Sequence, residues 1–186
     1  GRNKYEKVLS DFRTGKIQIL VGTQMIAKGL DFPNVTLVGI ICADISLHVP
    51  DFRSEERTFQ LLTQVAGRAG RGERTGEVII QTFIPSNPAI LFALKHDFKS
   101  FFNYEIEVRK KFLYPPITHM LAVHLRSENE NMLIDVGDQL IQDLKPAIQK
   151  ETRVTGPTPS PIPKIKGKFR YVILFKGNKL APIKRS

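Results

Sequence analysis

The sequence predicts an α/β domain with a parallel sheet, followed by a small α+β domain. Over the first 85 residues, short apolar segments alternate with amphipathic ones, as expected for the strands and helices of a buried parallel sheet. A strong breaker, Pro85–Pro88, ends this part. A long helical pattern and then a strand–helix–strand pattern follow it. We therefore expect the first domain at 1–85, a connecting helix at 86–115 and the second domain at 116–186.

A short helix and two apolar strands come first. The helix should end near Gly15, and its apolar face is formed by Val8, Leu9 and Phe12. We expect the strands at Ile17–Val21 and Thr36–Cys42. Because these strands are largely apolar on both faces, helices should cover both sides of the sheet. Cys42 would then be a buried, unreactive thiol.

A second helix and a third strand complete the first domain. Ser54 should cap this helix, with Glu55 and Glu56 in the first turn, near the positive end of the helix dipole. Its buried stripe is predicted to be Phe59, Leu62 and Val65. The helix runs into glycines, and the third strand is expected at Glu77–Phe83.

The connecting segment has one long helical pattern. It should run from Pro88 to just before Tyr114–Pro116. Its stripe, at spacings of three or four with one polar exception, consists of Leu91, Leu94, Phe98, Phe101, Glu105, Val108 and Phe112. We expect the phenylalanine cluster of this helix to lie in the core; its members are Phe98, Phe101 and Phe102.

The second domain should contain a strand at Met120–Leu125 and a helix at Glu130–Gln149. The inner face of this helix is predicted to be Met132, Leu133, Val136, Leu140, Ile141, Leu144 and Ile148. Proline occupies every second position within Gly156–Pro163, which favours an extended crossover without backbone donors. A last strand is expected at Tyr171–Phe175.

The charge of the chain is concentrated in residues 150–186. The whole chain has 28 Lys and Arg against 18 Asp and Glu, a net charge of +10. Residues 150–186 contribute 10 − 1 = +9, because Glu151 is their only acid. This asymmetry indicates a polyanionic partner, with nucleic acid first and an anionic membrane surface or an acidic peptide behind it. A solubilising tail is the alternative.

Cysteine content and hydropathy exclude other classes of protein. A single cysteine excludes a disulfide framework and a cysteine-based zinc site, and it favours a reducing, intracellular compartment. The longest apolar stretches are too short to cross a bilayer. We therefore expect a soluble, cytoplasmic protein with no membrane partner and no metal in this chain.

The most specific motif is Gln64–Arg71, QVAGRAGR, at the end of the second helix. Arg68 and Arg71 are three residues apart and fall on one side of a helical turn, and the glycines allow close approach of backbone to a phosphate. Arginine is permanently charged and binds oxyanions with two donors, which suits a transferring γ-phosphoryl group. A basic loop that touches DNA or solvent is the alternative.

A second motif, Ile19–Phe32, joins a predicted strand to a Gly-Leu-Asp turn. Ligands of open α/β sheets bind beyond the carboxyl ends of strands, where Thr23 could offer a hydroxyl and a backbone N–H to a phosphate. Asp31 could hold a ribose hydroxyl or a metal-bound water. An aspartate at such a position is also a common cap or turn former.

Four cations near the C-terminus occupy alternate positions: Lys164, Lys166, Lys168 and Arg170. In an extended chain they would project from one face as a strip of about 20 Å that can follow a phosphate backbone. Phe169 or Tyr171, on the other face, could stack on a base. The alternatives are a solvated edge strand that uses lysine against aggregation and a site for an acidic peptide.

The two motifs together resemble motifs V and VI in the second RecA-like lobe of superfamily 2 helicases. Three longer strings narrow the resemblance to the PriA family of primosomal replication-restart helicases, also called primosomal protein N′: Pro50–Arg71, Phe112–Leu125 and Gly156–Gly177. The resemblance implies the C-terminal part of an ATP-dependent 3′ to 5′ DNA helicase that recognises stalled forks and restarts replication by primosome assembly. It implies forked DNA, single-stranded DNA-binding protein and other primosome proteins as partners.

The resemblance also implies roles for individual residues. Those that would face the nucleotide are Gln64, Arg68 and Arg71, with Arg71 as the arginine finger. Gly29 and Asp31 would lie beside the nucleotide and Thr23 on the DNA side. The family's small C-terminal domain continues into another helix and strand, which the second domain would lack.

Departures from the family pattern limit what this chain could do alone. It has no G-x-x-x-x-G-K-[ST] string and no D-E-x-H string, so the phosphate-binding loop and the magnesium carboxylate are missing. The family's Cys-rich zinc region is missing too. We therefore expect ATP, Mg²⁺ and Zn²⁺ in a longer parent only, and no ATP hydrolysis by this chain. The alternatives are a non-catalytic module that binds DNA or single-stranded DNA-binding protein, and another superfamily 2 translocase.

Overall fold

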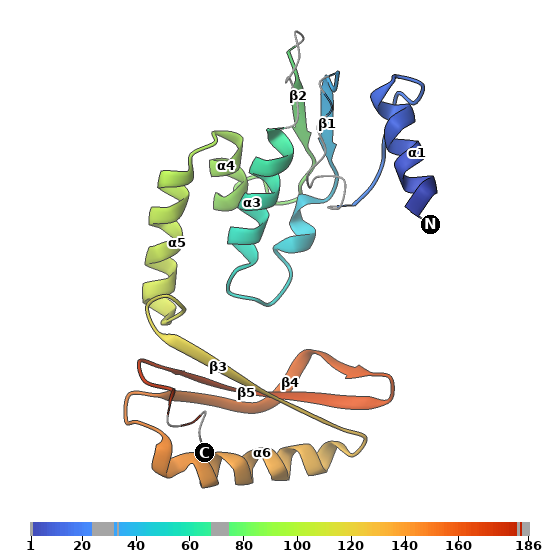
Figure 1. Cartoon of the computed structure of the whole chain (residues 1–186). Helices are drawn as coiled ribbons and strands as arrows, with labels where there is room; N and C mark the ends of the chain where they lie inside the picture. The colour runs from blue at the N-terminus through green and yellow to red at the C-terminus, as the bar shows by residue number, and fades with distance from the viewer. Residues whose placement is uncertain (1, 24–31, 33, 68–74, 182, 184–186) are drawn as a thin grey trace. The chain divides into compact units, whose positions relative to one another are not determined.

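The computed structural model describes residues 2–23, 32, 34–67, 75–181 and 183. The chain divides into two compact units, 1–103 and 104–186. Figure 1 shows helices beside a small parallel sheet in the first unit, and one helix beneath an antiparallel sheet in the second. The predicted class, an α/β part with a parallel sheet followed by an α+β part, is confirmed.

The elements of the first unit are α1 (Arg2–Arg13), β1 (Leu37–Ile40), the 3-10 helix η1 (Ala43–Ser46), α3 (Ser54–Ala66), β2 (Glu77–Ile80), α4 (Pro88–Leu94) and the start of α5 (Phe98–Phe112). Strands β1 and β2 pair in parallel, with Leu37 opposite Glu77. Helix α1 ends before Gly15 as predicted, and this glycine has a φ of 77° that suits the end of a helix.

The predicted strand at Ile17–Val21 is wrong. Within the described part of the chain β1 pairs only with β2, and the side chains of Ile19 and Val21 are 79% and 84% exposed. An apolar segment forms a strand only where a neighbouring strand satisfies its backbone groups. The described residues supply no such neighbour to this segment.

The expectation that helices cover both faces of the sheet is also wrong for the described residues. Ile40 and Ile80 pack on the core of the first unit. Leu37 and Ile79, which point to the opposite face, are 56% and 51% exposed. Cys42 lies beyond the end of β1 with a φ of 52° and is only partly buried, so the predicted buried thiol is wrong as well.

Helix α3 has the predicted amphipathic pattern but a different start. Glu55 and Glu56 lie in its first turn, as predicted. Arg53, and not Ser54, occupies the cap position. The Ser54 hydroxyl instead donates hydrogen bonds to the carbonyl oxygens of Val49 and Asp51, the second at 2.7 Å. It therefore ties the helix to the preceding loop, whereas a cap would satisfy helix donors.

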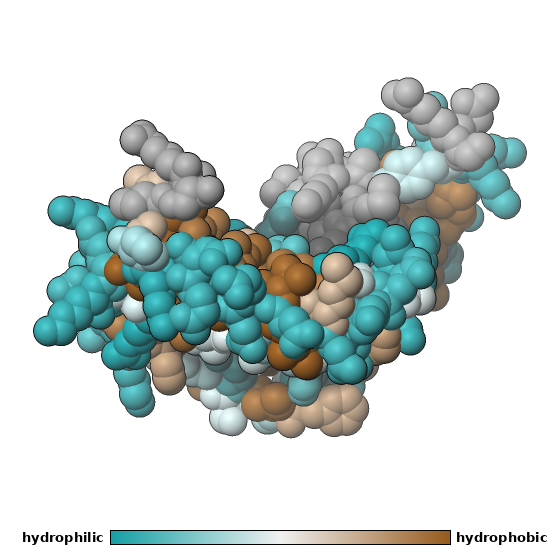
Figure 2. Space-filling model, turned by 90° about the horizontal axis from the view of Figure 1, so that it is seen from below, coloured by the Kyte–Doolittle hydropathy of each residue, from teal (hydrophilic) through white to brown (hydrophobic). Residues whose placement is uncertain are grey.

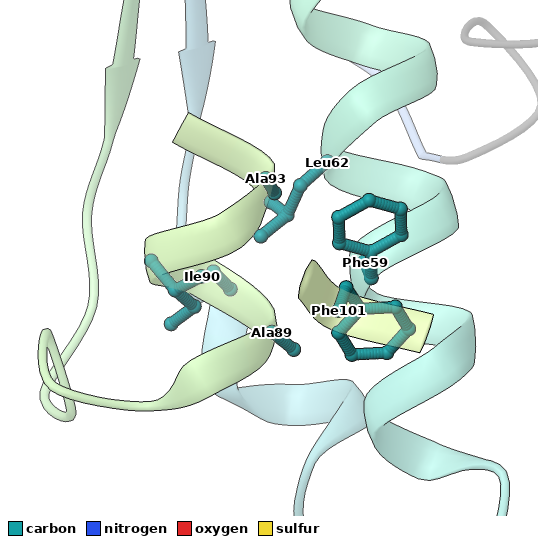
Figure 3. Close-up of a cluster of buried hydrophobic side chains, with 7 residues drawn as sticks. Phe59, Leu62, Ala89, Ile90, Ala93 and Phe101 are labelled. Atoms are coloured by element: carbon teal, nitrogen blue, oxygen red, sulfur yellow. The ribbon is translucent and has the colours of Figure 1, made fainter. Parts of the chain in front are cut away.

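The core of the first unit joins α3, α4 and α5 (Figure 3). Its buried members are Ala43, Phe59, Leu62, Ala89, Ile90, Ala93 and Phe101. The rings of Phe59 and Phe101 are parallel, with centroids 4.2 Å apart. Offset stacking of this kind adds to the burial of apolar surface, so this pair fixes α5 against α3.

The predicted continuous helix over the connecting segment is interrupted. Lys95–Asp97 separates α4 from α5, and His96 has a φ of 51°, which no helix interior allows. The interruption changes the phase of the apolar stripe. Phe101 is buried, whereas Phe98 and Phe102 are 66% and 52% exposed, so the prediction that all three lie in the core is wrong.

The polar exception in the stripe has a structural explanation. Glu105 is 8% exposed, and its carboxylate accepts a hydrogen bond from Arg109 Nε at 2.9 Å. The same guanidinium donates to the Pro115 carbonyl at 2.9 Å. A buried charge is tolerated when it is paired and hydrogen-bonded, and this pair joins α5 to the turn that follows it.

The second unit is a three-stranded antiparallel sheet with one helix on one face. Its elements are β3 (His119–Ser127), α6 (Glu130–Leu144), the 3-10 helix η2 (Lys145–Ala147), β4 (Arg153–Ile165) and β5 (Lys168–Gly177). The strand order is β3-β5-β4. Ile173 and Phe175 on the central strand are fully buried, and Leu121, Val123 and Leu144 pack around them.

Helix α6 differs from its prediction in where it ends and in which of its side chains are buried. It stops at Leu144, and a separate 3-10 turn begins at Lys145. Pro146 lies within this turn, and proline cannot supply the donor that a continuing α-helix needs. Met132 and Val136, predicted to face inward, are 54% and 45% exposed. Gly137 is buried instead, which allows the helix to approach the sheet closely.

The Pro-rich run Gly156–Pro163 is part of strand β4 and not a crossover before it. Thr158 lies opposite Val172 and Pro159 opposite Tyr171, with register shifts on both sides of this stretch. Because β4 is an edge strand, prolines can turn their missing donors away from the ladder. The predicted strands at Met120–Leu125 and Tyr171–Phe175 are confirmed, both as parts of longer strands.

Replacing Gly137 with alanine should destabilise the second unit. A Cβ there would lie 2.8 Å and 2.9 Å from ring carbons of Pro157 and 3.2 Å from a methyl of Leu125. We expect this overpacking to lower the free energy of unfolding by about 1–3 kcal/mol in total, although alanine favours a helix over glycine by about 1 kcal/mol. Urea unfolding should be compared with Asp138→Ala, an exposed control on α6. A Gly137→Ala variant as stable as the unmodified chain would contradict this close packing.

Candidate functional site

The described part of the nucleotide motif is the last turn of α3. Gln64 lies there, on the exposed side of a helix that Phe59 and Leu62 anchor in the core. Arg68 and Arg71 lie outside the described residues, as do Gly29 and Asp31. Thr23 is described and exposed, in the segment that forms no strand.

The carboxyl ends of β1 and β2, where ligands of parallel sheets bind, are held together by hydrogen bonds. Asp44 in η1 is 3% exposed; it accepts from Thr82 Oγ1 at 2.5 Å and from the Phe83 N–H at 3.0 Å. These donors lower the pKa of Asp44 below its usual value. The Cys42 N–H donates to Gln81 Oε1 at 2.7 Å. No local sequence pattern indicated these residues, because their partners are about 40 positions away along the chain.

The predicted extended strip of cations is wrong, because the segment is the tip of a β-hairpin. Lys166 and Gly167 form a two-residue turn with φ values of 50° and 78°, as in type I′ turns. Lys164 lies opposite Phe169, and Ile165 lies opposite Lys168.

The turn reverses which positions share a face of the sheet. Alternate residues share a face within one strand, whereas residues directly opposite each other share a face across a hairpin. Lys164 is therefore on the side of Phe169, and its Nζ lies 4.1 Å from the centroid of that ring. Lys168 and Arg170 point to the other face. The cations surround the hairpin tip and form no single row.

Contacts restrain three of the predicted DNA-binding residues. Lys168 Nζ lies 3.8 Å from Glu128 Oε1, and Arg170 Nη1 donates to the Ile162 carbonyl at 3.5 Å. The Tyr171 hydroxyl donates to Glu130 Oε1 at 3.0 Å, a bond that raises the pKa of Tyr171. Tyr171 is 6% exposed, so its ring offers no face for a base to stack on.

The sheet of the second unit has an open face, which we define as the side chains of β3, β5 and β4 that point away from α6. Its basic members are His124, Arg126, Arg153, Lys168, Arg170 and Lys176. Four of these residues were not predicted as site residues: His124, Arg126, Arg153 and Lys176. The even spacing of Arg170 and Lys176 along one strand could have indicated a shared face. Placing Arg126 and Arg153 beside them requires the strand register.

Two classes of site are not seen in the part of the chain that the structure describes. No three His, Cys, Asp or Glu side chains are grouped in a way that could hold a metal ion. No described helix has the length and apolar character needed to cross a bilayer.

Two family models match the chain on either side of the boundary between its units. Residues 2–73 match the helicase conserved C-terminal domain. Residues 110–186 match the primosomal protein N C-terminal domain. The first match contains both nucleotide motifs, and the second contains the hairpin and the open face.

Curated relatives align with nearly the whole chain. The replication restart protein PriA of Bacillus subtilis is 47% identical over 175 residues, which is 94% of this chain and 22% of that protein. PriA of Chlamydia pneumoniae is 37% identical over 99% of this chain and 25% of its own length. PriA of Treponema pallidum is 40% identical over 92% and 26%. The chain thus spans about a quarter of the length of these relatives, and it belongs to the PriA family of replication restart proteins.

Proposed function

We propose that this chain is the C-terminal part of an ATP-dependent 3′ to 5′ DNA helicase that recognises stalled replication forks and restarts replication by primosome assembly. The observation that carries the proposal is the alignment of 94% of the chain, at 47% identity, with a protein named for replication restart. The partners would be forked DNA, single-stranded DNA-binding protein and other primosome proteins. The site of action would be the bacterial cytoplasm, at the nucleoid.

Two other functions have less support. Another superfamily 2 translocase would share motifs V and VI, but the match of residues 110–186 to the primosomal protein N C-terminal domain favours the PriA function. A non-catalytic module that binds DNA or single-stranded DNA-binding protein remains compatible with the basic second unit considered by itself.

In this proposal the nucleotide is held mainly by parts of the longer protein. Of the residues assigned to the nucleotide, only Gln64 is described, and the chain has no P-loop to hold phosphates. Gln64, Arg68 and Arg71 would contact ATP from this chain, with Gly29 and Asp31 beside it and Thr23 toward the DNA. ATP and Mg²⁺ would supply the energy of translocation in the full-length protein, whose Zn²⁺ would lie outside this chain.

The hairpin tip would be the part of the second unit that contacts an anionic partner. Lys164, Lys166, Lys168 and Arg170 surround a two-residue turn, and Phe169 is only partly buried beside them. Cations near an aromatic ring suit single-stranded nucleic acid or an acidic, aromatic-ended peptide.

The purified chain of 186 residues should not hydrolyse ATP. Arginines that stabilise a γ-phosphoryl group have no effect without the loop and the metal carboxylate that position it. Phosphate release should stay at the background rate, with or without single-stranded DNA. DNA-stimulated turnover by the chain alone would contradict this prediction.

In the full-length protein, Arg71→Ala should lower kcat for ATP hydrolysis by roughly 10³-fold or more, because an arginine finger stabilises charge in the transition state. Steady-state rates with saturating DNA should be compared with Arg74→Ala, a control outside the motif, and with Arg68→Ala. An unchanged kcat in Arg71→Ala, with a loss in Arg68→Ala, would transfer the finger role to Arg68.

Replacing Lys164, Lys166, Lys168 and Arg170 together with alanine should weaken binding of the full-length protein to forked DNA. The slope of log K against log salt should flatten by about 0.7–0.9 for each phosphate that the variant no longer neutralises. Because these interactions are electrostatic, the sequence preference should hardly change.

Circular dichroism should first establish that this quadruple variant is folded, since Lys164 packs on Phe169. A folded variant with unchanged affinity and salt slope would exclude the hairpin as a DNA-binding element. An unchanged DNA slope, together with loss of binding to the acidic tail of single-stranded DNA-binding protein, would assign the hairpin to the peptide instead.

A further inference from the structure

Cations on the open face of the sheet come in two like-charged pairs. Arg126 lies directly opposite Arg170, and Arg153 lies directly opposite Lys176. Like charges at opposed positions destabilise a sheet. Among the described residues neither Arg126 nor Arg153 forms an ion pair. A sheet that keeps two such pairs on one face is suited to a ligand that neutralises them.

The second unit is strongly polarised between its two faces. The outward-pointing residues of the three strands include no acid, and the remaining ones are apolar or carry hydroxyl groups. Helix α6, on the other face, has four carboxylates and no Lys or Arg in ENMLIDVGDQLIQDL. Figure 2 shows the side on which α6 lies, where hydrophilic side chains surround a smaller hydrophobic patch. A polyanion would be attracted to the sheet face and repelled from the helix.

We propose that the open face binds the sugar–phosphate backbone of duplex DNA, with Arg126–Arg170 and Arg153–Lys176 each clamping phosphates. This inference rests on the proposed DNA function, and it extends the DNA-binding surface from the hairpin tip to the whole face of the sheet. Of the four clamping cations, Arg170 also belongs to the hairpin tip, as does Lys168 beside it on the open face. The other three clamping cations lie outside the motif that the sequence indicated.

The spacing and composition of the face favour binding to the backbone over base stacking. Arg170 and Lys176 are six residues apart on β5, about 20 Å along a strand, which corresponds to about six nucleotides at 3.4 Å each. No Phe, Tyr or Trp points outward from the three strands. The nearby Tyr114 ring is covered by Lys176, whose Nζ lies 3.8 Å from its centroid. Without an exposed ring the face cannot stack bases as single-strand binders do.

The test compares two double variants of the 186-residue chain with the same change in net charge. Arg126→Gln with Arg153→Gln removes one cation from each pair on the open face. Lys145→Gln with Lys150→Gln removes two exposed cations from segments outside the sheet. The probes are 20-base-pair duplexes of two unrelated sequences and a single strand of the same length, titrated at several salt concentrations.

We expect the open-face variant to bind both duplexes about tenfold more weakly, with a salt slope smaller by the contribution of about two phosphates. The affinity of the control variant should fall much less. The melting temperature of the free open-face variant should equal or exceed that of the unmodified chain, because the substitutions relieve repulsion between opposed cations. The single strand should bind more weakly than either duplex.

Equal losses of affinity in the two variants would overturn the inference, since only total charge would then matter. Full affinity in the open-face variant would overturn it, and weaker fork binding by the quadruple variant of the full-length protein would then still support the DNA function of the hairpin. If the unmodified chain bound no duplex at all, the inference and the DNA role of the second unit would both fail.

Discussion

The burial of one face of β5 against α6 is the constraint on which the second unit depends. Ile173 and Phe175 have no exposed surface, and a side-chain period of two then forces their neighbours to the opposite face. Arg170 and Lys176 can therefore only point away from the helix. The same packing brings α6 so close to β4 that Gly137 has no room for a side chain. Hydrophobic burial on one side thus determines where the cations of the other side gather.

Burial of one apolar face also organises the first unit, where different elements form the core. Its core lies between α3, α4, α5 and one face of the β1–β2 pair, and the stacked rings of Phe59 and Phe101 connect helices that are far apart in sequence. Hydrogen bonds that the Asp44 carboxylate accepts from Thr82 and Phe83 hold η1 to the segment that follows β2. Because buried polar groups are costly unless paired, this network fixes the backbone at the sheet edge where such folds bind ligands. Helix α3, which carries the nucleotide motif, is anchored to the same core.

The charges of the second unit are divided between its two faces. Helix α6 has only acidic charges, and the open face has only basic ones. Binding through phosphates depends on charge and spacing and not on base identity. A protein proposed to act at forks of any sequence would benefit from such binding, whereas base-specific recognition would restrict it to particular sites.

The sequence alone determined the features that depend on local pattern or on a rare motif. Short apolar runs were sufficient for β3 and β5, and period-3.6 apolar spacing was sufficient for α3 and α6. The two nucleotide motifs and the longer strings around them were sufficient for the family. Tertiary structure decided whatever depends on a partner distant in the chain. Ile17–Val21 has strand-like residues but no described neighbour to pair with, and the stripe from Leu91 to Phe112 loses its phase at His96.

A two-residue turn places Lys164 and Lys168 on opposite faces although both numbers are even. Only strand register brings Arg126 and Arg153 beside Arg170 and Lys176, because residues opposed across a ladder have no fixed separation in sequence.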